Sequence, residues 1–536
     1  MKAQAVMAMA AAGLASSAAP PNTILPTPPM GFNNWARFMT NINETIFIDA
    51  AVAMTNNGLR AAGYDRLNLD DAWSLRQRDS NGSMVADPAK FPSGLPWLTG
   101  WMRSQGFKPG IYTDAGSLSC GGYPGALDHE KRDLKDFLRW GFGYLKMDGC
   151  NLPDDTEETY HEIYSRWPML LSYPKENAMV FSDSAPAYFS NQKNLTDWYR
   201  AMGWAADYGQ LARHSADIVT YPNGNGWKSI MFNYGQNLRL ARFQRPGFFN
   251  DPDLLIPDHP SLTMEEKKSQ FALWCSMSSP LLLSADIPNL PQDTIDFLTN
   301  PALIAVDQDR LAQQATLVSR NATWDVLTRS LANGDRLLTV LNRGDSSASI
   351  DIPWQRTGID HRYIGEGNIT VQDLWTGQAT LLPASGAQLA INNVPAHGTA
   401  VYRLKSVGPI TPTGAIFNTN SFKCLTDSSS GNVTWAACQG TDAQVWTYDK
   451  DTAHVRSLLR RRECLVAVDG TVVTKRGCER HQTSPWTYKS SGNLVDNKSG
   501  NCLTEDIDGT VIAEGCGYLL NQQVLGLPAG VPIAMF

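Results

Sequence analysis

Aspartates follow short apolar segments at many points between residues 28 and 307. Any one of them suits a turn or the start of a helix, but their recurrence after apolar segments favours one shared site. Carboxylates with Lys and Arg bind the hydroxyls of a neutral sugar, and glycoside hydrolysis ordinarily needs two carboxyl groups. The pattern therefore suits a glycoside as ligand. The residues are Asp70, Asp71, Asp114, Asp148, Asp217, Asp251, Asp253 and Asp286.

The segments that carry these aspartates have the pattern of strands alternating with helices. Helical periodicity separates several of them, as at residues 128–140 and 263–276. Eight such units predict a (β/α)8 TIM barrel over residues 20–305, whose active site lies where the carboxyl ends of the strands converge. The expected strand segments are 31–35, 64–73, 108–116, 143–150, 178–184, 215–220, 246–251 and 280–286.

The remainder of the chain predicts two further domains. Residues 306–405 alternate in short apolar strands with Gly, Asp and Asn turns, which indicates an antiparallel β domain. Residues 406–414 have the Pro, Gly and Thr content of a linker. Residues 415–536 contain three units, 424–438, 464–478 and 502–516, each with two cysteines fourteen apart. Such a threefold repeat predicts a β-trefoil.

Composition excludes several classes of partner. The 536 residues carry a net charge of −7 without a long basic run, so neither nucleic acid nor an anionic membrane is an expected partner. A hydrophobic share of 43% leaves ample material for cores. The eight His lack metal-ligand spacing, and we expect no metal and no cofactor.

The N-terminus predicts secretion. Residues 1–19 place one Lys before an Ala, Met and Leu run that ends in small residues, the pattern of a signal peptide. No later stretch is apolar for about 20 residues, so we expect a soluble extracellular protein with no membrane segment. Seven glycosylation sequons agree with this, at Asn43, Asn81, Asn194, Asn321, Asn368, Asn432 and Asn497.

Six motifs across residues 26–405 resemble glycoside hydrolase family 27, the α-galactosidases and α-N-acetylgalactosaminidases. They are PPMGFNNWARF, LNLDDAW, GIYTDAG, YLKMDGC, RHSAD and FNDPDLL, in the family's order. The resemblance implies that Asp148 is the nucleophile and Asp217 the general acid/base of a retaining exo-glycosidase that acts through a covalent glycosyl-enzyme. Lys146 precedes Asp148 by two residues, projects to the same side of the strand and favours the ionised nucleophile.

The same resemblance implies the residues that hold the sugar. Trp35 matches the ring that covers it, and Asp70 and Asp71 match the pair that grips its distal hydroxyls. Cys120 and Cys150 match a disulfide at the pocket wall. Further family contacts correspond to Tyr112, Lys146, Tyr188, Arg213, Asp253 and Leu254, with a packing role open for Tyr112 and Leu254.

The loop at 181–188 bears on the sugar's second position. In related α-galactosidases a Glu holds O2 there, and in animal enzymes a Leu fills the space nearby. Ser184 and Ala187 stand at these two places, the pair of the family's α-N-acetylgalactosaminidases, which removes a charge and makes room for an acetamido group. The resemblance thus implies hydrolysis of terminal α-galactosyl-type residues with N-acetylgalactosamine favoured. An ordinary α-galactosidase and an inactive glycan-binding lectin are the alternatives.

The C-terminal repeats resemble a ricin-type β-trefoil, whose Gln-X-Trp mark is clear at Gln444–Trp446. In such modules a sugar-contacting Asp usually follows Cys-Leu, but here Thr426, Val466 and Thr504 stand there, so binding of a polysaccharide or glycoprotein stays open. The repeats imply the disulfides Cys424–Cys438, Cys464–Cys478 and Cys502–Cys516. Cys275, in an apolar helical segment, is then left as a buried free thiol.

Overall fold

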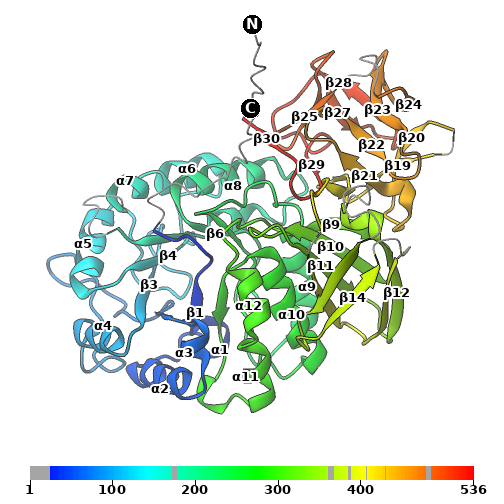
Figure 1. The fold of residues 1–536 in the computed structure, drawn as a ribbon. Coiled ribbons are helices and arrows are strands. Elements are labelled where there is room, and N and C mark those ends of the chain that lie inside the picture. The colour runs from blue at the N-terminus through cyan, green and yellow to red at the C-terminus, as the bar shows by residue number, and fades with distance from the viewer. Residues whose placement is uncertain are drawn as a thin grey trace, which may run out of the picture.

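The computed structural model describes residues 24–171, 178–359, 367–383, 388–405, 407–428, 430–478 and 485–535. The expected signal peptide, residues 1–19, lies outside these ranges. Figure 1 shows a ring of strands and helices from the N-terminal half, a β domain beside it and a second β domain above both. This order confirms the expected fold class.

The first part is an eight-stranded parallel barrel. β1 pairs with β2 on one side and β8 on the other, and a parallel bridge between Leu255 and Leu283 joins the segment after β7 to β8. The strands are β1 (Met30–Asn33), β2 (Arg66–Asn68), β3 (Lys108–Asp114), β4 (Tyr144–Asp148), β5 (Val180–Asp183), β6 (Leu211–Arg213), β7 (Phe249–Asp251) and β8 (Leu281–Leu283).

One expected strand was wrong. The sixth strand is Leu211–Arg213, and residues 215–220 form the loop after it. The pairing explains this, because Leu211 and Ala212 lie opposite Ser182 and Asp183 of β5 and complete the parallel ladder before Ser215 is reached. Asp217 therefore lies on a loop beyond the strand end, where its side chain pairs with Arg213 of β6 at 2.8 Å.

Helices surround the barrel, and their ends are capped by local sequence. In α10, Thr263 accepts the N–H of Glu266 while the Glu266 carboxylate accepts the N–H of Thr263. The helices of this part are α1 (Trp35–Phe38), α2 (Glu44–Asn56), α3 (Leu59–Ala62), α4 (Leu95–Ser104), α5 (Glu130–Trp140), α6 (Glu157–Tyr164), α7 (Trp167–Leu171), α8 (Thr196–Tyr208), α9 (Gly226–Asn237), α10 (Met264–Met277), α11 (Gln292–Leu298) and α12 (Pro301–Asp307). Short 3-10 turns are η2 (Ala185–Phe189) and η3 (Ile287–Asn289).

An apolar cluster fills the barrel near the amino ends of its strands. It contains Tyr144, Val180, Leu211 and Phe249 from four neighbouring strands. Leu25 and Ala312, from outside the strands, belong to the same cluster. The polar strand ends lie at the opposite face, where barrels of this kind carry their active sites.

The second part is an antiparallel β sandwich. Its larger sheet runs in the order β14-β13-β16-β11-β10-β9, and β12 pairs with β15. Ser276 of α10 and Thr339 of β11 lie 2.7 Å apart through their hydroxyls, so the sheet packs on the barrel. The strands are β9 (Thr316–Arg320), β10 (Trp324–Ser330), β11 (Arg336–Asn342), β12 (Ala348–Pro353), β13 (Asn368–Asp373), β14 (Ala379–Pro383), β15 (Gln388–Val394) and β16 (Thr399–Lys405); η4 is Trp354–Thr357.

The third part is the trefoil. β17 begins at Thr413, inside the expected linker. The strands are β17 (Thr413–Ala415), β18 (Phe417–Asn418), β19 (Cys424–Asp427), β20 (Val433–Ala436), β21 (Val445–Tyr448), β22 (Val455–Ser457), β23 (Glu463–Val468), β24 (Thr471–Arg476), β25 (Trp486–Lys489), β26 (Leu494–Asp496), β27 (Cys502–Glu505), β28 (Val511–Glu514), β29 (Leu525–Gly526) and β30 (Ile533–Ala534), with η5 at Asp442–Gln444.

Within each repeat the cysteines pair as expected, at a sequence separation of 14, and Cys275 is buried and free. Trp446 is fully buried, and its indole N–H donates to the Leu425 carbonyl at 2.8 Å. Asp427, close to the usual sugar-contacting position, is buried and paired with Arg460. Trp446 and Asp427 therefore stabilise the trefoil fold through these contacts.

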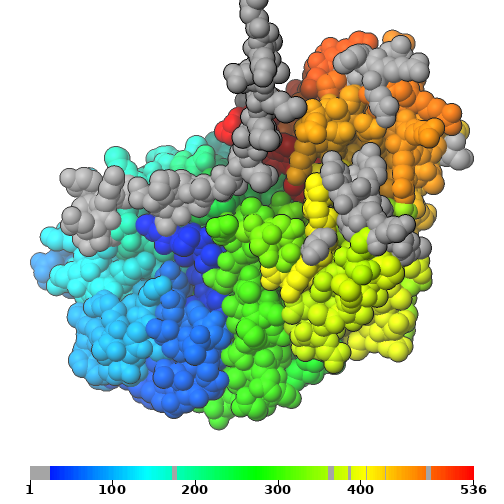
Figure 2. Space-filling model, in the orientation of Figure 1, coloured from blue at the N-terminus to red at the C-terminus, as the bar shows by residue number. Residues whose placement is uncertain are grey.

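The three parts adjoin one another (Figure 2). The Tyr199 hydroxyl of α8 lies 2.7 Å from the Thr419 hydroxyl of the trefoil. Arg356, beyond β12, pairs with Asp442 at 2.7 Å. Every helix in the described ranges is too short or too polar to cross a bilayer.

Candidate active site

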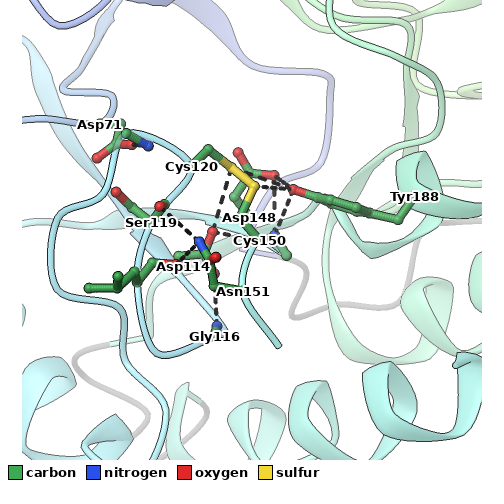
Figure 3. Close-up of a disulfide and its surroundings, with 12 residues drawn as sticks. Asp71, Asp114, Gly116, Ser119, Cys120, Asp148, Cys150, Asn151 and Tyr188 are labelled. Carbon is green, nitrogen blue, oxygen red and sulfur yellow. Dashed lines mark hydrogen bonds between the residues drawn. A yellow bond between two sulfur atoms is a disulfide. The ribbon is translucent and has the colours of Figure 1, made fainter. Parts of the chain in front are cut away.

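Asp148 ends β4 at the carboxyl end of the barrel strands, and two tyrosines contact its carboxylate. Figure 3 shows one of them, Tyr188, beside Asp148. The Tyr188 hydroxyl donates to Oδ1 at 2.6 Å, and the Tyr112 hydroxyl donates to Oδ2 at 3.3 Å. The N–H of Gly149 donates to the Tyr188 oxygen at 3.1 Å. Both carboxylate oxygens thus have a phenol donor, which fixes the direction in which the group points.

The disulfide Cys120–Cys150 that the family resemblance implies is present, and its two sulfurs lie 3.6 and 3.3 Å from the Tyr188 hydroxyl that contacts Asp148. Gly121, next to Cys120, donates its N–H to Asp71 Oδ2 at 2.8 Å, and Cys150 donates its N–H to Asp114 Oδ2 at 3.0 Å. Burial, and then the charge of Asp148, raise the pKa of Asp114 well above its ordinary value. The cross-link therefore positions two backbone N–H groups against two buried carboxyls, and its sulfurs are not available as thiolate metal ligands.

Lys146 and Asp70 form a buried ion pair at the base of the site. Lys146 Nζ lies 2.7 Å from Asp70 Oδ2, and their side chains are 11% and 1% exposed. Asn33 Nδ2 donates to the same oxygen at 2.7 Å. Lys146 also feels the charges of Asp148 and Asp217, which together with Asp70 raise its pKa against the opposing effect of burial. Lys146 thus contacts Asp70 directly, whereas its electrostatic interaction with Asp148 acts through space.

Arg213 joins two further carboxylates. Its Nη2 lies 2.8 Å from Asp217 Oδ1 and 3.1 Å from Asp253 Oδ2. Asp217 has 60% of its side chain exposed, whereas Asp253 has 2%. Arg213 therefore joins a solvent-facing carboxylate to a buried one. Burial alone would raise the pKa of Asp217, but Arg213, then Lys146, hold it below its ordinary value. The Trp35 side chain lowers the pKa of Asp217 further.

The loop after β5 carries small, uncharged side chains on the turn that also carries Tyr188. Ser184 is buried, and its hydroxyl has no hydrogen-bond partner among the described residues. Ala187 is half-buried on η2, next to Tyr188, whose hydroxyl reaches Asp148. Leu254 is 5% exposed, and its carbonyl accepts from Gln270 at 3.0 Å, which favours packing as its role.

Family models cover nearly the whole described chain. The α-galactosidase A model matches residues 27–309, more than half of the protein. The α-galactosidase C-terminal β-sandwich model matches residues 321–404, and the ricin-type β-trefoil lectin model matches residues 412–524. The chain belongs to the α-galactosidase family of glycoside hydrolases, family 27.

Relatives in this α-galactosidase family match over most of the chain. α-Galactosidase A of Aspergillus niger is 49% identical over 522 residues, 96% of this chain and 93% of its own. α-Galactosidase 2 of Arabidopsis thaliana is 36% identical over 66% of this chain and 84% of its own. Among solved structures, α-galactosidase I of Mortierella vinacea aligns with a TM-score of 0.64 at 26% identity, over 72% of this chain and 98% of its own. The α-galactosidase of Saccharomyces cerevisiae, solved with raffinose, has a TM-score of 0.61 at 25% identity, over 71% and 97%.

The sequence did not predict some residues that support the candidate site of this α-galactosidase family member. Asn33 and Asn34 both hold Asp70, through its carboxylate and through its backbone N–H, at 2.7 and 2.8 Å. The paired asparagines at the end of the first apolar segment were the signal. Tyr160, whose hydroxyl donates to the Gly149 carbonyl at 2.6 Å, supports the segment next to Asp148 but stands in a helix with no local pattern that marks it.

Proposed function

We propose that the protein is a secreted, retaining exo-glycosidase for terminal α-galactosyl-type residues, with a pocket that favours α-N-acetylgalactosamine over α-galactose. The observation that carries the proposal is the small, uncharged pair Ser184 and Ala187 on the loop whose Tyr188 contacts Asp148. α-Galactosidase chemistry follows from family membership, and the roles of individual residues are part of the proposal.

Asp148 is the proposed nucleophile. It attacks the anomeric carbon and forms a covalent glycosyl-enzyme while Asp217 protonates the departing glycosidic oxygen. Asp217 then removes a proton from water, which attacks the anomeric carbon and releases Asp148, so the α configuration is retained. Arg213 and Lys146 hold the pKa of Asp217 below its ordinary value, so the protonated Asp217 that the first step needs is populated in acid solution.

The buried pair Asp70 and Lys146, with Asp71, is proposed to bind the hydroxyls on the far side of the sugar ring. Asp70 is held by Lys146 and Asn33, so its oxygens cannot move to suit a different epimer. A sugar that leaves such a carboxylate without its hydroxyl partner binds poorly. Trp35, half-buried beside Asp217, is proposed to cover the apolar face of the ring.

The preference for N-acetylgalactosamine rests on volume and charge. A Glu at 184 would place a charge beside the sugar's second carbon, and a Leu at 187 would fill the space that an acetamido group needs. Ser184 and Ala187 do neither, and the Ser184 hydroxyl has no hydrogen-bond partner in the described part of the chain. Galactose leaves this space underfilled, a difference of about 1–3 kcal/mol.

The test compares kcat/KM for an aryl α-N-acetylgalactosaminide with that for the matching aryl α-galactoside. We expect the first to be higher by roughly 10- to 200-fold. The double variant Ser184→Glu/Ala187→Leu should invert the preference, and Ala89→Leu, on an exposed loop, serves as a control for a surface Leu. A wild-type preference for galactose would support an ordinary α-galactosidase, and an inactive wild type would support the lectin alternative.

Retention of configuration has a test of its own. Proton NMR of the first-formed sugar should show the α anomer, and a β anomer would exclude the double displacement. Secretion is supported by the four disulfides, which persist in oxidising compartments. The lectin match supports carbohydrate binding by the trefoil, which a glycan array probed with the full chain would measure.

A further inference from the structure

Asp183, the last residue of β5, is a buried carboxyl that forms no ion pair with any of the described residues. It has no solvent exposure. Its Oδ1 accepts the N–H of Ala185 at 2.8 Å, and its Oδ2 has no hydrogen-bond partner among the described residues. Burial raises its pKa to about 8, so in acid and near-neutral solution the group is a neutral carboxylic acid. A buried acid is costly to keep, so we expect the hydrogen bond that Asp183 makes with Ala185 to have a structural role.

That bond lies at the start of η2. Ser184, which precedes the turn, makes no side-chain cap hydrogen bond, and Pro186 has no N–H to offer. Asp183 therefore supplies the side-chain acceptor for the first N–H of the turn, which secondary structure alone would leave unpaired. The strands beneath are already fixed, since the Ser184 N–H donates to the Met147 carbonyl at 3.0 Å.

The turn that Asp183 starts carries the side chain that contacts Asp148. Tyr188 lies on η2, and its hydroxyl donates to Asp148 Oδ1 at 2.6 Å (Figure 3). Tyr160 and Tyr188 also pack together, with ring centroids 5.3 Å apart. A carboxylate with one oxygen held by a fixed donor presents the other in a defined direction, and small errors in such positioning have large effects on rate.

We propose that Asp183 is a positioning residue that fixes the first turn of η2 and thereby holds Tyr188 against Asp148. The inference rests on the proposed nucleophile role of Asp148 and is independent of the preference between galactose and N-acetylgalactosamine. Asp183 does not touch the substrate in this scheme. It acts through Tyr188 alone.

The experiment measures kcat/KM on an aryl α-galactoside for Asp183→Asn, Asp183→Ala and Asp183→Val, with melting temperatures recorded in parallel. Asn keeps the acceptor oxygen, so D183N should stay within about threefold of wild type. D183A, and D183V if the alanine variant does not fold, lack the acceptor and should lose about 10- to 100-fold. Asp307 is the matched control: it is equally buried, one of its oxygens is unpartnered, and it ends α12. D307A should lower the melting temperature and leave kcat/KM of the folded enzyme unchanged.

A double-mutant cycle with Tyr188→Phe separates positioning from general damage. If Asp183 acts through Tyr188, D183A lowers kcat/KM by less than about threefold in the Y188F background. Additive losses, or a D183A enzyme as active as wild type, would overturn the proposal. Asp148→Asn distinguishes the two levels: residual full activity in D148N removes the nucleophile assignment itself, whereas an inactive D148N with an unaffected D183A removes only the positioning role.

Discussion

Replacing Asp183 by Asn should change how stability depends on pH. The carboxyl is fully buried, and burial raises its pKa from 3.8 to about 8. Between these values the folded protein holds a proton that the unfolded chain releases, so the free energy of unfolding falls as pH rises. At about 1.4 kcal/mol per pH unit, the titration of Asp183 lowers the free energy of unfolding by on the order of 5 kcal/mol between pH 4 and pH 7.5.

Asn does not titrate, but its amide NH2 group takes the position of Asp183 Oδ2. That oxygen has no hydrogen-bond partner among the described residues, so the amide N–H groups would lack one too. D183N should therefore be less stable than wild type at pH 4, by roughly 1–3 kcal/mol, and more stable at pH 7.5 by a similar amount. The change in the melting-temperature difference should be about 5–15 °C across this range. Differential scanning fluorimetry of both proteins at half-unit pH steps measures it.

Comparison with wild type at each pH cancels the contributions of other buried carboxyls. Asp251, for example, has its pKa raised by burial to about 6 and weakens the fold in the same direction as pH rises. A difference between D183N and wild type that stays constant within 2 °C from pH 4 to 7.5 would refute the reasoning, because Asp183 would then not carry the extra proton of the folded state.

The remaining predictions concern the catalytic groups. Asp148→Asn should lower kcat by about 10⁴-fold or more while the far-ultraviolet circular dichroism and melting temperature stay near wild type, and a turnover close to wild type would contradict the nucleophile role. Because Arg213 and Lys146 hold the pKa of Asp217 low and the acid must be protonated, kcat/KM should fall as pH rises through the acid range; a profile that peaks above neutrality would be inconsistent with this. Lys146→Met should cost about 3–5 kcal/mol in urea unfolding by leaving Asp70 buried and unpaired, and adding Asp70→Asn should recover part of the loss; no recovery would mean that the pair is not the cause.

Local sequence patterns predicted much of the fold and the catalytic motifs. Apolar segments that end in Asp, Asn or Ser predicted the barrel, and cysteines fourteen apart predicted the trefoil disulfides, since both signals lie within one structural unit. The sixth strand shows the limit of this reasoning. The run 215–220 resembles a strand as well as residues 211–213 do, and only pairing with β5 and β7 selects the latter.

Sequence alone therefore determined the order of the domains, the family and the identities of the candidate catalytic carboxylates, because these depend on residue types at short spacing. Tertiary structure decided which distant side chains contact one another. Lys146 meets Asp70 across 76 residues, and the Tyr188 hydroxyl meets Asp148 across 40. The sequence also did not predict the burial that keeps Asp183 protonated. A pKa and a hydrogen-bond partner depend on which distant side chains the packed barrel brings together and on how much water it excludes.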